Sequence, residues 1–240
     1  MRSLFVAGCT VAGLWLLACT NTESENIKTS GIHADIDVTA TGTGQTEVST
    51  WLRVGASSNT FLDLSDGDEL IASKGTESKK MTRREVFGSV TYNATFDADA
   101  AETEFKVAFE RENDVSAPNS HGTLPAAFSL TAPAAAASFA RATDTITITW
   151  DPSGASDRMH VAANGTCIQA YDVDLDGDPG TATINPSAFK EPTDAEQQGK
   201  TCDVTIELRR TRPGTVDSAY GEGGDFISRQ VRSRKISSKP

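Results

Sequence analysis

Apolar and polar residues alternate along most of this chain after residue 31. Runs with a period of two residues cover 32–40, 48–54, 90–96 and 105–109 in the first half, and 145–150, 202–208 and 226–236 in the second. Successive side chains of a strand point to opposite sides, so each run predicts a strand with one buried face. Helical periodicity is not convincing anywhere, and the sequence therefore predicts an all-β fold.

A change of composition near 125–139 separates the runs into two groups. Four alanines, Ala134 to Ala137, follow Pro133 and precede a fresh alternating run. Small side chains of this kind suit a connector between domains. We expect two tandem β-sandwich domains, at 32–132 and 140–240. A single continuous sandwich is the alternative.

The run at 145–150 ends in Trp150-Asp151-Pro152. A β-branched strand that closes on Trp-x-Pro resembles the second strand of fibronectin type III modules. The resemblance implies that Trp150 fills the core of an immunoglobulin-like sandwich. The alternating strand at 202–208 begins with Cys202, where such modules carry a tyrosine. This departure concerns the resemblance to fibronectin type III modules, and the prediction of a β-sandwich does not depend on it.

The first residues have the pattern of a secretory signal. A basic start, Met1-Arg2, precedes an apolar run from Leu4 to Leu17, and Ala18-Cys19 is followed at once by polar residues. This arrangement resembles the signal of bacterial lipoproteins. The resemblance implies a signal peptide at 1–18 and acylation of Cys19, palmitate included. A plain secretory signal with a spare thiol at Cys19, or acylation at Cys9, are the alternatives.

The lipid anchor would make the membrane a partner of this protein. Thr20 follows the anchor cysteine, and by the rule for enteric bacteria this residue permits transport to the outer membrane. We therefore expect an anchored protein of the bacterial cell envelope. Residues 19–31 are rich in Thr, Asn, Ser and Glu and lack periodicity, so they are expected to form a flexible, solvated tether.

Two cysteines remain beyond the predicted signal and anchor, Cys167 and Cys202. In an oxidising compartment such a pair is expected to form a disulfide. A metal-binding pair or two free thiols are the alternatives, although no CxxC motif and no nearby histidine support a metal. The three histidines of the chain, His33, His121 and His160, lie in no metal-binding spacing.

The segment Asp172-Val173-Asp174-Leu175-Asp176-Gly177-Asp178 is the sharpest local motif. Alternating carboxylates followed by glycine at the sixth position match the first half of a calcium loop. The twelfth position is Thr183, which lacks the bidentate carboxylate that closes such loops. The motif predicts at most a weak calcium site formed by Asp172, Asp174, Asp176 and Asp178. The alternative is a plain Asp-Gly hairpin turn between two strands; no other cofactor is predicted.

The net charge and the motifs of the chain narrow the range of possible functions further. The net charge is −11 and no broad basic face is evident, which argues against a nucleic-acid partner. Local basic residues at 209–212 and 229–239 predict either protection of a sheet edge or a stripe that contacts an anionic glycan or a lipid headgroup. No nucleophile elbow, phosphate loop or dinucleotide motif is present.

These observations predict a membrane-anchored lipoprotein with a non-catalytic binding or structural role rather than an enzyme. Its protein or glycan partner is not defined by the sequence. A calcium-assisted carbohydrate-binding or adhesion module is the first alternative. A hydrolase with an unrecognised site is the second, because paired carboxylates are defined by their separation in space.

Overall fold

The computed structural model describes residues 20–65 and 67–240, and within these ranges the protein is built almost entirely from β-strands. Two short 3-10 helices, at Ser24–Asn26 and Thr29–Gly31, are the exceptions. None of the helices in these ranges has the length and apolar character of a membrane span. The predicted all-β fold is confirmed, and the alternating runs are strands with nearly the expected bounds.

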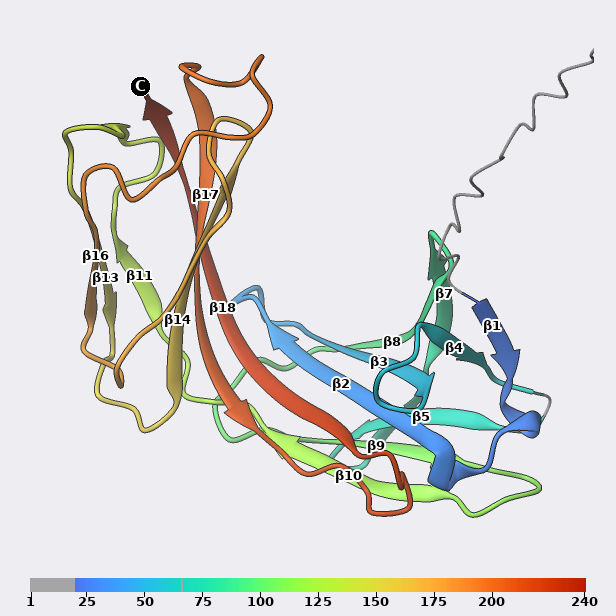
Figure 1. Cartoon of the computed structure of the whole chain (residues 1–240). Helices are drawn as coiled ribbons and strands as arrows, with labels where there is room; N and C mark the ends of the chain where they lie inside the picture. The colour runs from blue at the N-terminus through green and yellow to red at the C-terminus, as the bar shows by residue number, and fades with distance from the viewer. Residues whose placement is uncertain (1–19, 66) are drawn as a thin grey trace, which may run out of the picture.

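One large sheet organises the described part of the chain (Figure 1). Its main path has the spatial order β1 (Thr20–Glu23), β4 (Thr60–Asp63), β3 (Thr46–Val54), β2 (Ile32–Ala40), β18 (Gly224–Lys239), β17 (Cys202–Pro213), β14 (Arg158–Gly165) and β15 (Tyr171–Asp174). Three further strands pair with members of this path, β8 (Ser89–Phe96) with β3, β7 (Thr82–Val86) with β8, and β12 (Ser138–Ala140) with β18.

Two smaller sheets cover one face of the large sheet at its two ends. The first contains β10 (Ala117–Thr123), β9 (Glu104–Glu110), β5 (Glu69–Lys74) and β6 (Glu77–Lys80). The second contains β11 (Ser129–Ala132), β13 (Ile146–Asp151) and β16 (Thr181–Ile184). Both lie on the same face, because Phe226 and Ile236 of β18, an even number of residues apart, enter the first and the second core respectively.

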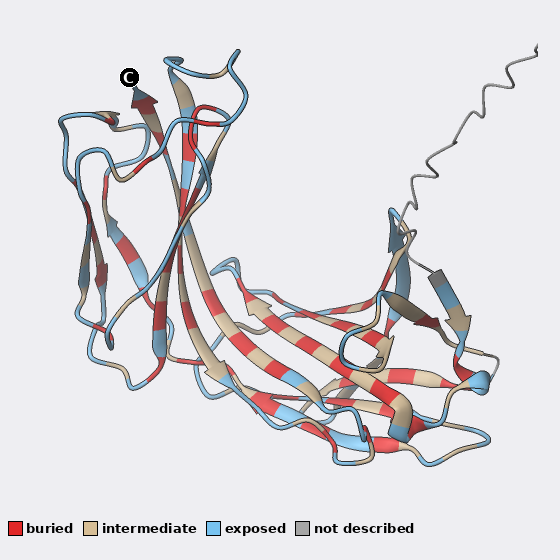
Figure 2. Cartoon of the chain, in the orientation of Figure 1, coloured by how far each residue is buried: buried red, intermediate tan, exposed pale blue. Residues whose placement is uncertain are grey.

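The large sheet bends between its two ends, and the molecule has two arms (Figure 1). We call β1–β10 with residues 214–230 the first arm, and β11–β17 with residues 231–239 of β18 the second arm. Each arm is a sandwich with its own apolar core, and buried residues alternate with more exposed ones along its strands (Figure 2). The uncovered face of the large sheet, which we call the concave face, is turned toward the space between the arms (Figure 1).

The strands of the two sequence halves are shared between the arms. Residues 224–230 of β18 pair in parallel with residues 34–40 of β2. Tyr220 and Phe226, from the segment predicted as the second domain, are buried in the first core. The two cores therefore share one continuous sheet.

The expectation of a flexible tether is wrong for residues 20–31. Strand β1 pairs in parallel with β4, and Ser24 and Thr29 are buried. The guanidinium of Arg111 donates hydrogen bonds to the carbonyls of Ser24 and Ile27, at 2.8 and 3.2 Å. Backbone carbonyls of this segment and the hydroxyls of Ser24 and Thr29 thus bond to the body of the first arm, and such polar contacts leave no hydrophobic periodicity in the sequence.

Ion pairs and hydrogen bonds join the arms where they meet. Arg212 of β17 contacts Glu102 of the first arm at 2.8 Å and Asp157 of the second arm at 2.7 Å. Arg212 also donates a hydrogen bond to the hydroxyl of Thr123 in the first arm, at 3.0 Å. These contacts hold the two arms in one arrangement around the concave face.

Candidate functional site

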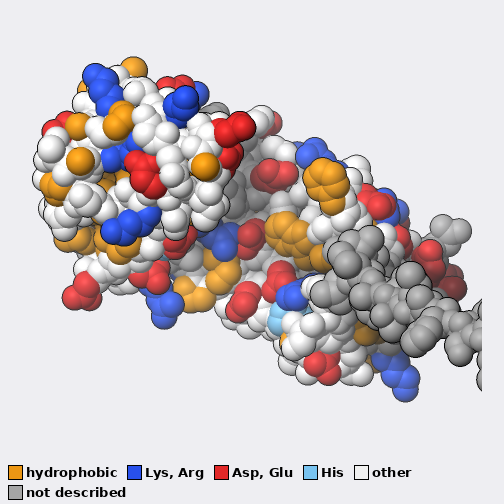
Figure 3. Space-filling view, turned by 45° about the horizontal axis from the view of Figure 1, so that its top comes forward, with side chains coloured by type: hydrophobic (Ala, Val, Ile, Leu, Met, Phe, Trp, Pro, Cys, Tyr) orange, Lys and Arg blue, Asp and Glu red, His pale blue; other side chains and the backbone are white. Residues whose placement is uncertain are grey.

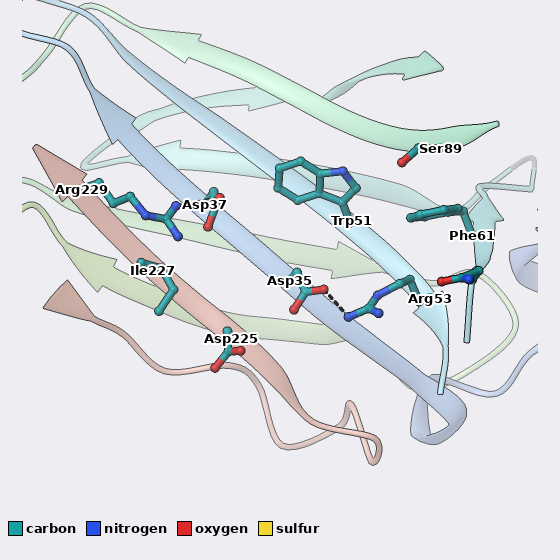
Figure 4. A pocket seen from close by; sticks show the side chains of 10 residues that line it. Asp35, Asp37, Trp51, Arg53, Phe61, Ser89, Asp225, Ile227 and Arg229 are labelled. Carbon is teal, nitrogen blue, oxygen red and sulfur yellow. Dashed lines mark hydrogen bonds and ion pairs between the residues drawn. The ribbon is translucent and has the colours of Figure 1, made fainter. Parts of the chain in front are cut away.

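A pocket of about 500 Å³ lies on the concave face, over the first arm (Figure 4). It falls within the range of volumes typical of small-molecule sites. Its lining residues come from five strands of the large sheet and one loop: Asp35, Asp37, Trp51, Arg53, Asn59, Phe61, Ser89, Asp225, Ile227 and Arg229. Acidic, basic and apolar side chains lie together on this surface between the arms (Figure 3).

Strand alternation places these side chains on one surface. In β2, the residues Ile32 to Ala40 are alternately buried and half-buried, so Asp35 and Asp37 face outward while Ile36 enters the core. The register of β2 with β3 sets Asp35 opposite Trp51, and its register with β18 sets Asp35 opposite Asp225. A pattern of local alternation therefore assembles a site from residues almost two hundred positions apart.

Two aromatic side chains form the apolar part of the pocket. Trp51 is half-buried on β3, and Phe61 is half-buried on β4. Phe61 pairs with Arg53, two residues beyond Trp51 on the same face. Figure 4 shows both rings beside the cluster of charged side chains. Partly exposed aromatic rings with polar groups around them are typical of sites that bind organic ligands.

The charged side chains of the pocket are mostly paired with one another. Arg53 donates a hydrogen bond to Asp35 at 2.6 Å, and Arg229 contacts Asp37 at 2.7 Å. His33 contacts the other oxygen of Asp35 at 3.1 Å and the carbonyl of Glu222 at 2.8 Å. These pairs fix the side chains and leave little net charge on this part of the surface.

Asp225 differs from the other two carboxylates. It is exposed and has no ion pair among the described residues. Its register neighbour on β2 is Asp35, another carboxylate. Like charges in neighbouring positions of a sheet are unfavourable. An uncompensated acceptor in the same pocket as the two aromatic rings is therefore available for hydrogen bonds from a ligand.

The four aspartates of the predicted calcium motif are not brought together. Asp172 and Asp174 contact the ring nitrogens of His160 at 2.8 and 2.9 Å, and Asp176 is exposed. The side chain of Asp178 is fully buried and contacts Arg210 at 2.6 Å. Among the described residues no group of three or more acidic, histidine or cysteine side chains is arranged to hold a metal ion. The converging oxygens that the motif predicted are absent from this arrangement.

The alternative prediction for this segment, a hairpin turn, is wrong. Strand β15 pairs with β14 in the large sheet, whereas β16 pairs with β13 in the small sheet of the second arm. The segment therefore crosses from one sheet of the sandwich to the other. This crossing carries Asp178 into the interior, where it also accepts a hydrogen bond from the indole of Trp150 at 2.6 Å.

The predicted disulfide is confirmed. Cys167 and Cys202 are bonded, with their Cα atoms 5.7 Å apart. This distance lies in the usual range for a disulfide. The bond ties the loop after β14 to the start of β17 in the second arm. Trp150, expected to fill the core on the resemblance, is buried in the second core.

The basic residues of the last third do not form a stripe of free charge. Arg209 is paired with Glu207, Arg210 with Asp178, and Arg212 with Asp157 and Glu102. The basic residues of β18 also have partners. Arg232 lies over the ring of Phe128, and Arg234 donates to the carbonyl of Leu130. Lys235 contacts Asp203. Side chains of successive residues point to opposite faces, and this separates the charges that are adjacent in sequence.

Sequence reasoning did not find the pocket, although it found several of the strands that form it. Asp35 and Asp37 alternate with apolar residues and read as an ordinary solvated face. His121, expected in a turn, lies in β10 instead. Cys19, the predicted lipidation site, lies outside the described residues. Trp51, a large aromatic at an outward position of an alternating run, is the sequence signal that could have pointed to the pocket, but its neighbours depend on how the strands pair.

Comparison with known proteins adds little to this picture. No family model matches the chain, and no curated protein matches it. The solved structures that it resembles include a two-domain fibronectin type III segment of chicken tenascin, at 13% identity, covering 86% of this chain and 98% of that one with a TM-score of 0.24.

Two bacterial structures are similar in the same sense. Fibronectin(III)-like modules of Clostridium thermocellum CbhA match at 10% identity over 86% of this chain and 90% of that one, with a TM-score of 0.25. The Bacteroides ovatus mixed-linkage glucan utilization protein SGBP-B, solved with a mixed-linkage heptasaccharide, matches at 9% identity over 97% and 69%, with a TM-score of 0.21. These scores are too low to assign a family or function, and the fold assignment rests on the strands themselves.

Proposed function

We propose that this protein is a lipid-anchored binding protein of the cell envelope whose concave face binds a neutral saccharide. The observation that carries the proposal is the pocket that Trp51 and Phe61 line together with Asp35, Asp225 and Arg229. The anchor part of the proposal rests on the signal pattern that ends at Cys19. The role is one of binding, without catalysis.

The composition of the pocket favours a sugar over other small ligands. A sugar ring has faces of C–H groups, which pack on flat aromatic rings, and a rim of hydroxyl groups. Hydroxyl groups both donate and accept hydrogen bonds. Carboxylates of Asp35 and Asp225 would accept them, and the guanidinium of Arg229 would donate to them. Aromatic surface with a few placed polar groups is the usual composition of a binding pocket.

The internal ion pairs favour a ligand without charge. Arg53 and Arg229 are each engaged by a carboxylate, at 2.6 and 2.7 Å. An anionic glycan would have to displace these partners, and truncating or displacing one member of a charged pair is costly. A neutral saccharide can bond to the remaining donors and acceptors while the pairs stay in place. The dispersed arginines of β17 likewise give no support to an anionic ligand.

Titration calorimetry with neutral gluco-, manno-, galacto- and xylo-oligosaccharides tests the pocket. Trp51→Ala should weaken binding at least about tenfold, which corresponds to about 1.4 kcal/mol. Val115→Ala is the matched control, since Val115 is an exposed apolar side chain outside the pocket. Circular dichroism should show both variants folded, because Trp51 faces outward from the sheet.

Several results would contradict the proposal. Equal loss of affinity in both variants would place the ligand elsewhere. Binding of polygalacturonate or heparin alone would contradict the neutral ligand. Release of reducing ends from a bound oligosaccharide would show a hydrolase. Separately, Cys19→Ser should move the protein from the detergent phase to the aqueous phase in phase partitioning. An unchanged distribution would contradict the proposal of a lipid anchor.

A further inference from the structure

The β7–β8 hairpin ends in an exposed apolar tip. Phe87 is 100% exposed and Val86 is 62% exposed, among the few exposed large hydrophobic residues of the described chain. The two-residue loop, Phe87-Gly88, has positive φ at both positions, 51° and 79°. Loops of this kind favour Asn-Gly or Gly-Gly, and a bulky side chain at positive φ is strained. Neither burial in a core nor the residue preference of the turn therefore explains the aromatic side chain at position 87.

A free cation accompanies the apolar tip. Arg84 and Val86 are two residues apart on β7 and lie on the same face of the strand. Arg84 is exposed and forms no ion pair with any described residue, in contrast to Arg83, which is paired with Asp63 and Glu85. The hairpin end therefore offers an aromatic ring, an aliphatic side chain and one unpaired positive charge.

The tip lies at the end of the sheet where the described chain begins. Strand β8 and strand β4 are both antiparallel to β3, and β1 is parallel to β4. The starts of β1, β4 and β8 therefore point to one end, and Figure 1 shows β7 and the beginning of β1 there. Phe61 of β4 and Ser89 of β8 line the same pocket, which places these strand starts close together. Thr20 directly follows Cys19, so a lipid on Cys19 would enter the membrane beside this tip.

We propose that the Val86–Phe87 tip inserts into the interfacial layer of the membrane that holds the anchor, while Arg84 contacts anionic lipid headgroups. The inference rests on the lipid anchor of the proposed function. Aromatic side chains are enriched at the membrane–water interface, and basic side chains are attracted to anionic lipid. Single acyl chains hold a protein only marginally, and a second contact strengthens the attachment. Two points of contact would also fix the direction in which the first arm faces.

An environment-sensitive fluorophore at the tip tests the proposal. The acylated protein carrying Phe87→Cys is labelled with NBD and reconstituted into vesicles of phosphatidylethanolamine and phosphatidylglycerol. The label should shift to shorter wavelength and be quenched several-fold by doxyl groups on the lipid chains. The matched control is Val173→Cys, which places the label on an exposed apolar position of the second arm. This label should keep its aqueous emission.

A second variant separates the side chain from the fold. Phe87→Asn suits positive φ, so the hairpin should remain intact while the apolar ring is lost. In a chain that also carries Cys19→Ser, Phe87→Asn should lower the partition coefficient on anionic vesicles several-fold. Equal partitioning with and without Phe87 would overturn the inserted tip.

The outcomes distinguish this inference from the anchor. If the acylated protein floats with vesicles but the label at residue 87 stays aqueous, the tip is not inserted while the anchor stands. A protein that does not float at all contradicts the anchor and, with it, the inserted tip. A shift that depends on protein concentration without vesicles would assign the tip to contact between copies of the chain and overturn the membrane contact.

Discussion

Replacing Asp178 with alanine should destabilise the second arm more than any surface change in the same segment. One carboxylate oxygen of Asp178 accepts hydrogen bonds from Arg210 at 2.6 Å and from the amide of Ala155 at 2.9 Å. The other oxygen accepts from the indole of Trp150 at 2.6 Å. The side chains of Asp178 and Arg210 both have 0% exposure. A fully buried pair of this kind cannot exchange its partner for water.

The size of the destabilisation follows from the contacts that Arg210 keeps after the carboxylate of Asp178 is removed. Arg210 keeps the carbonyls of Ala126 and Pro152, each at 2.8 Å, but its charge loses its counterion. Removing one partner of a buried pair costs about 3–5 kcal/mol. The total free energy of unfolding of a typical protein is about 5–15 kcal/mol. Asp178→Ala should therefore remove a large fraction of the stability.

Urea unfolding followed by tryptophan emission measures this effect, because Trp150 contacts Asp178 directly. Asp176→Ala is the matched control, since Asp176 is an exposed carboxylate of the same segment. Its free energy of unfolding should stay within about 0.5 kcal/mol of the parent protein. The double variant Arg210→Met/Asp178→Leu should recover much of the loss, because it removes both charges together.

Two results would refute this reasoning. A loss below about 1 kcal/mol in Asp178→Ala, the size of one ordinary hydrogen bond, would mean that the pair is not buried as described. Calcium-dependent stability of the parent protein that disappears in Asp178→Ala would show that the carboxylate binds a cation instead of Arg210.

Four further outcomes are expected. Tyr92→Phe should lower the free energy of unfolding by about 1–3 kcal/mol, because the hydroxyl of Tyr92 donates to the carbonyl of Leu62 and accepts from the amide of Leu64. Tyr220→Phe should instead be neutral or stabilising, because the buried hydroxyl of Tyr220 has no partner among the described residues. Burial raises the pKa of Tyr92 to about 12, so its neutral form favours folding below pH 10, and stability should fall as the pH rises from 10 to 12, less steeply in Tyr92→Phe. Reducing the Cys167–Cys202 bond should cost about 3–4 kcal/mol in urea titrations, and an unchanged midpoint would contradict a structural role. Millimolar calcium should shift the melting temperature of Asp174→Ala and the parent protein equally, and a shift confined to the parent would restore the calcium site.

The sequence predicted individual strands well because strand alternation is a local property. The run at 32–40 alternates in sequence and in burial, and the same holds for 90–96. The pairing of residues 224–230 with residues 34–40 is not local, and nothing in either run specifies the other. The prediction of two separate domains therefore could not include a sheet that runs through both.

The chemistry of single residues depended on pairing in the same way. Asp178 belongs to an acidic run that reads as solvated, yet the crossing between sheets buries it against Arg210, which reads as part of a basic run. Considered alone, each of the two side chains would be predicted to face solvent. Their pairing explains why both are buried. The pocket has the same character, since Trp51, Asp225 and Phe61 meet only when the sheet is assembled.

The central claim is that the concave face of the first arm binds a neutral saccharide. The most direct test is an NMR titration of isotope-labelled protein with the oligosaccharide that binds best. Perturbed signals should be confined to the pocket, with the indole N–H of Trp51 and the amides of Asp35, Phe61 and Asp225 among them. Signals of Asp172, Asp174 and the β16 strand should not move. Perturbations centred on the second arm, or none at saturating oligosaccharide, would contradict the account.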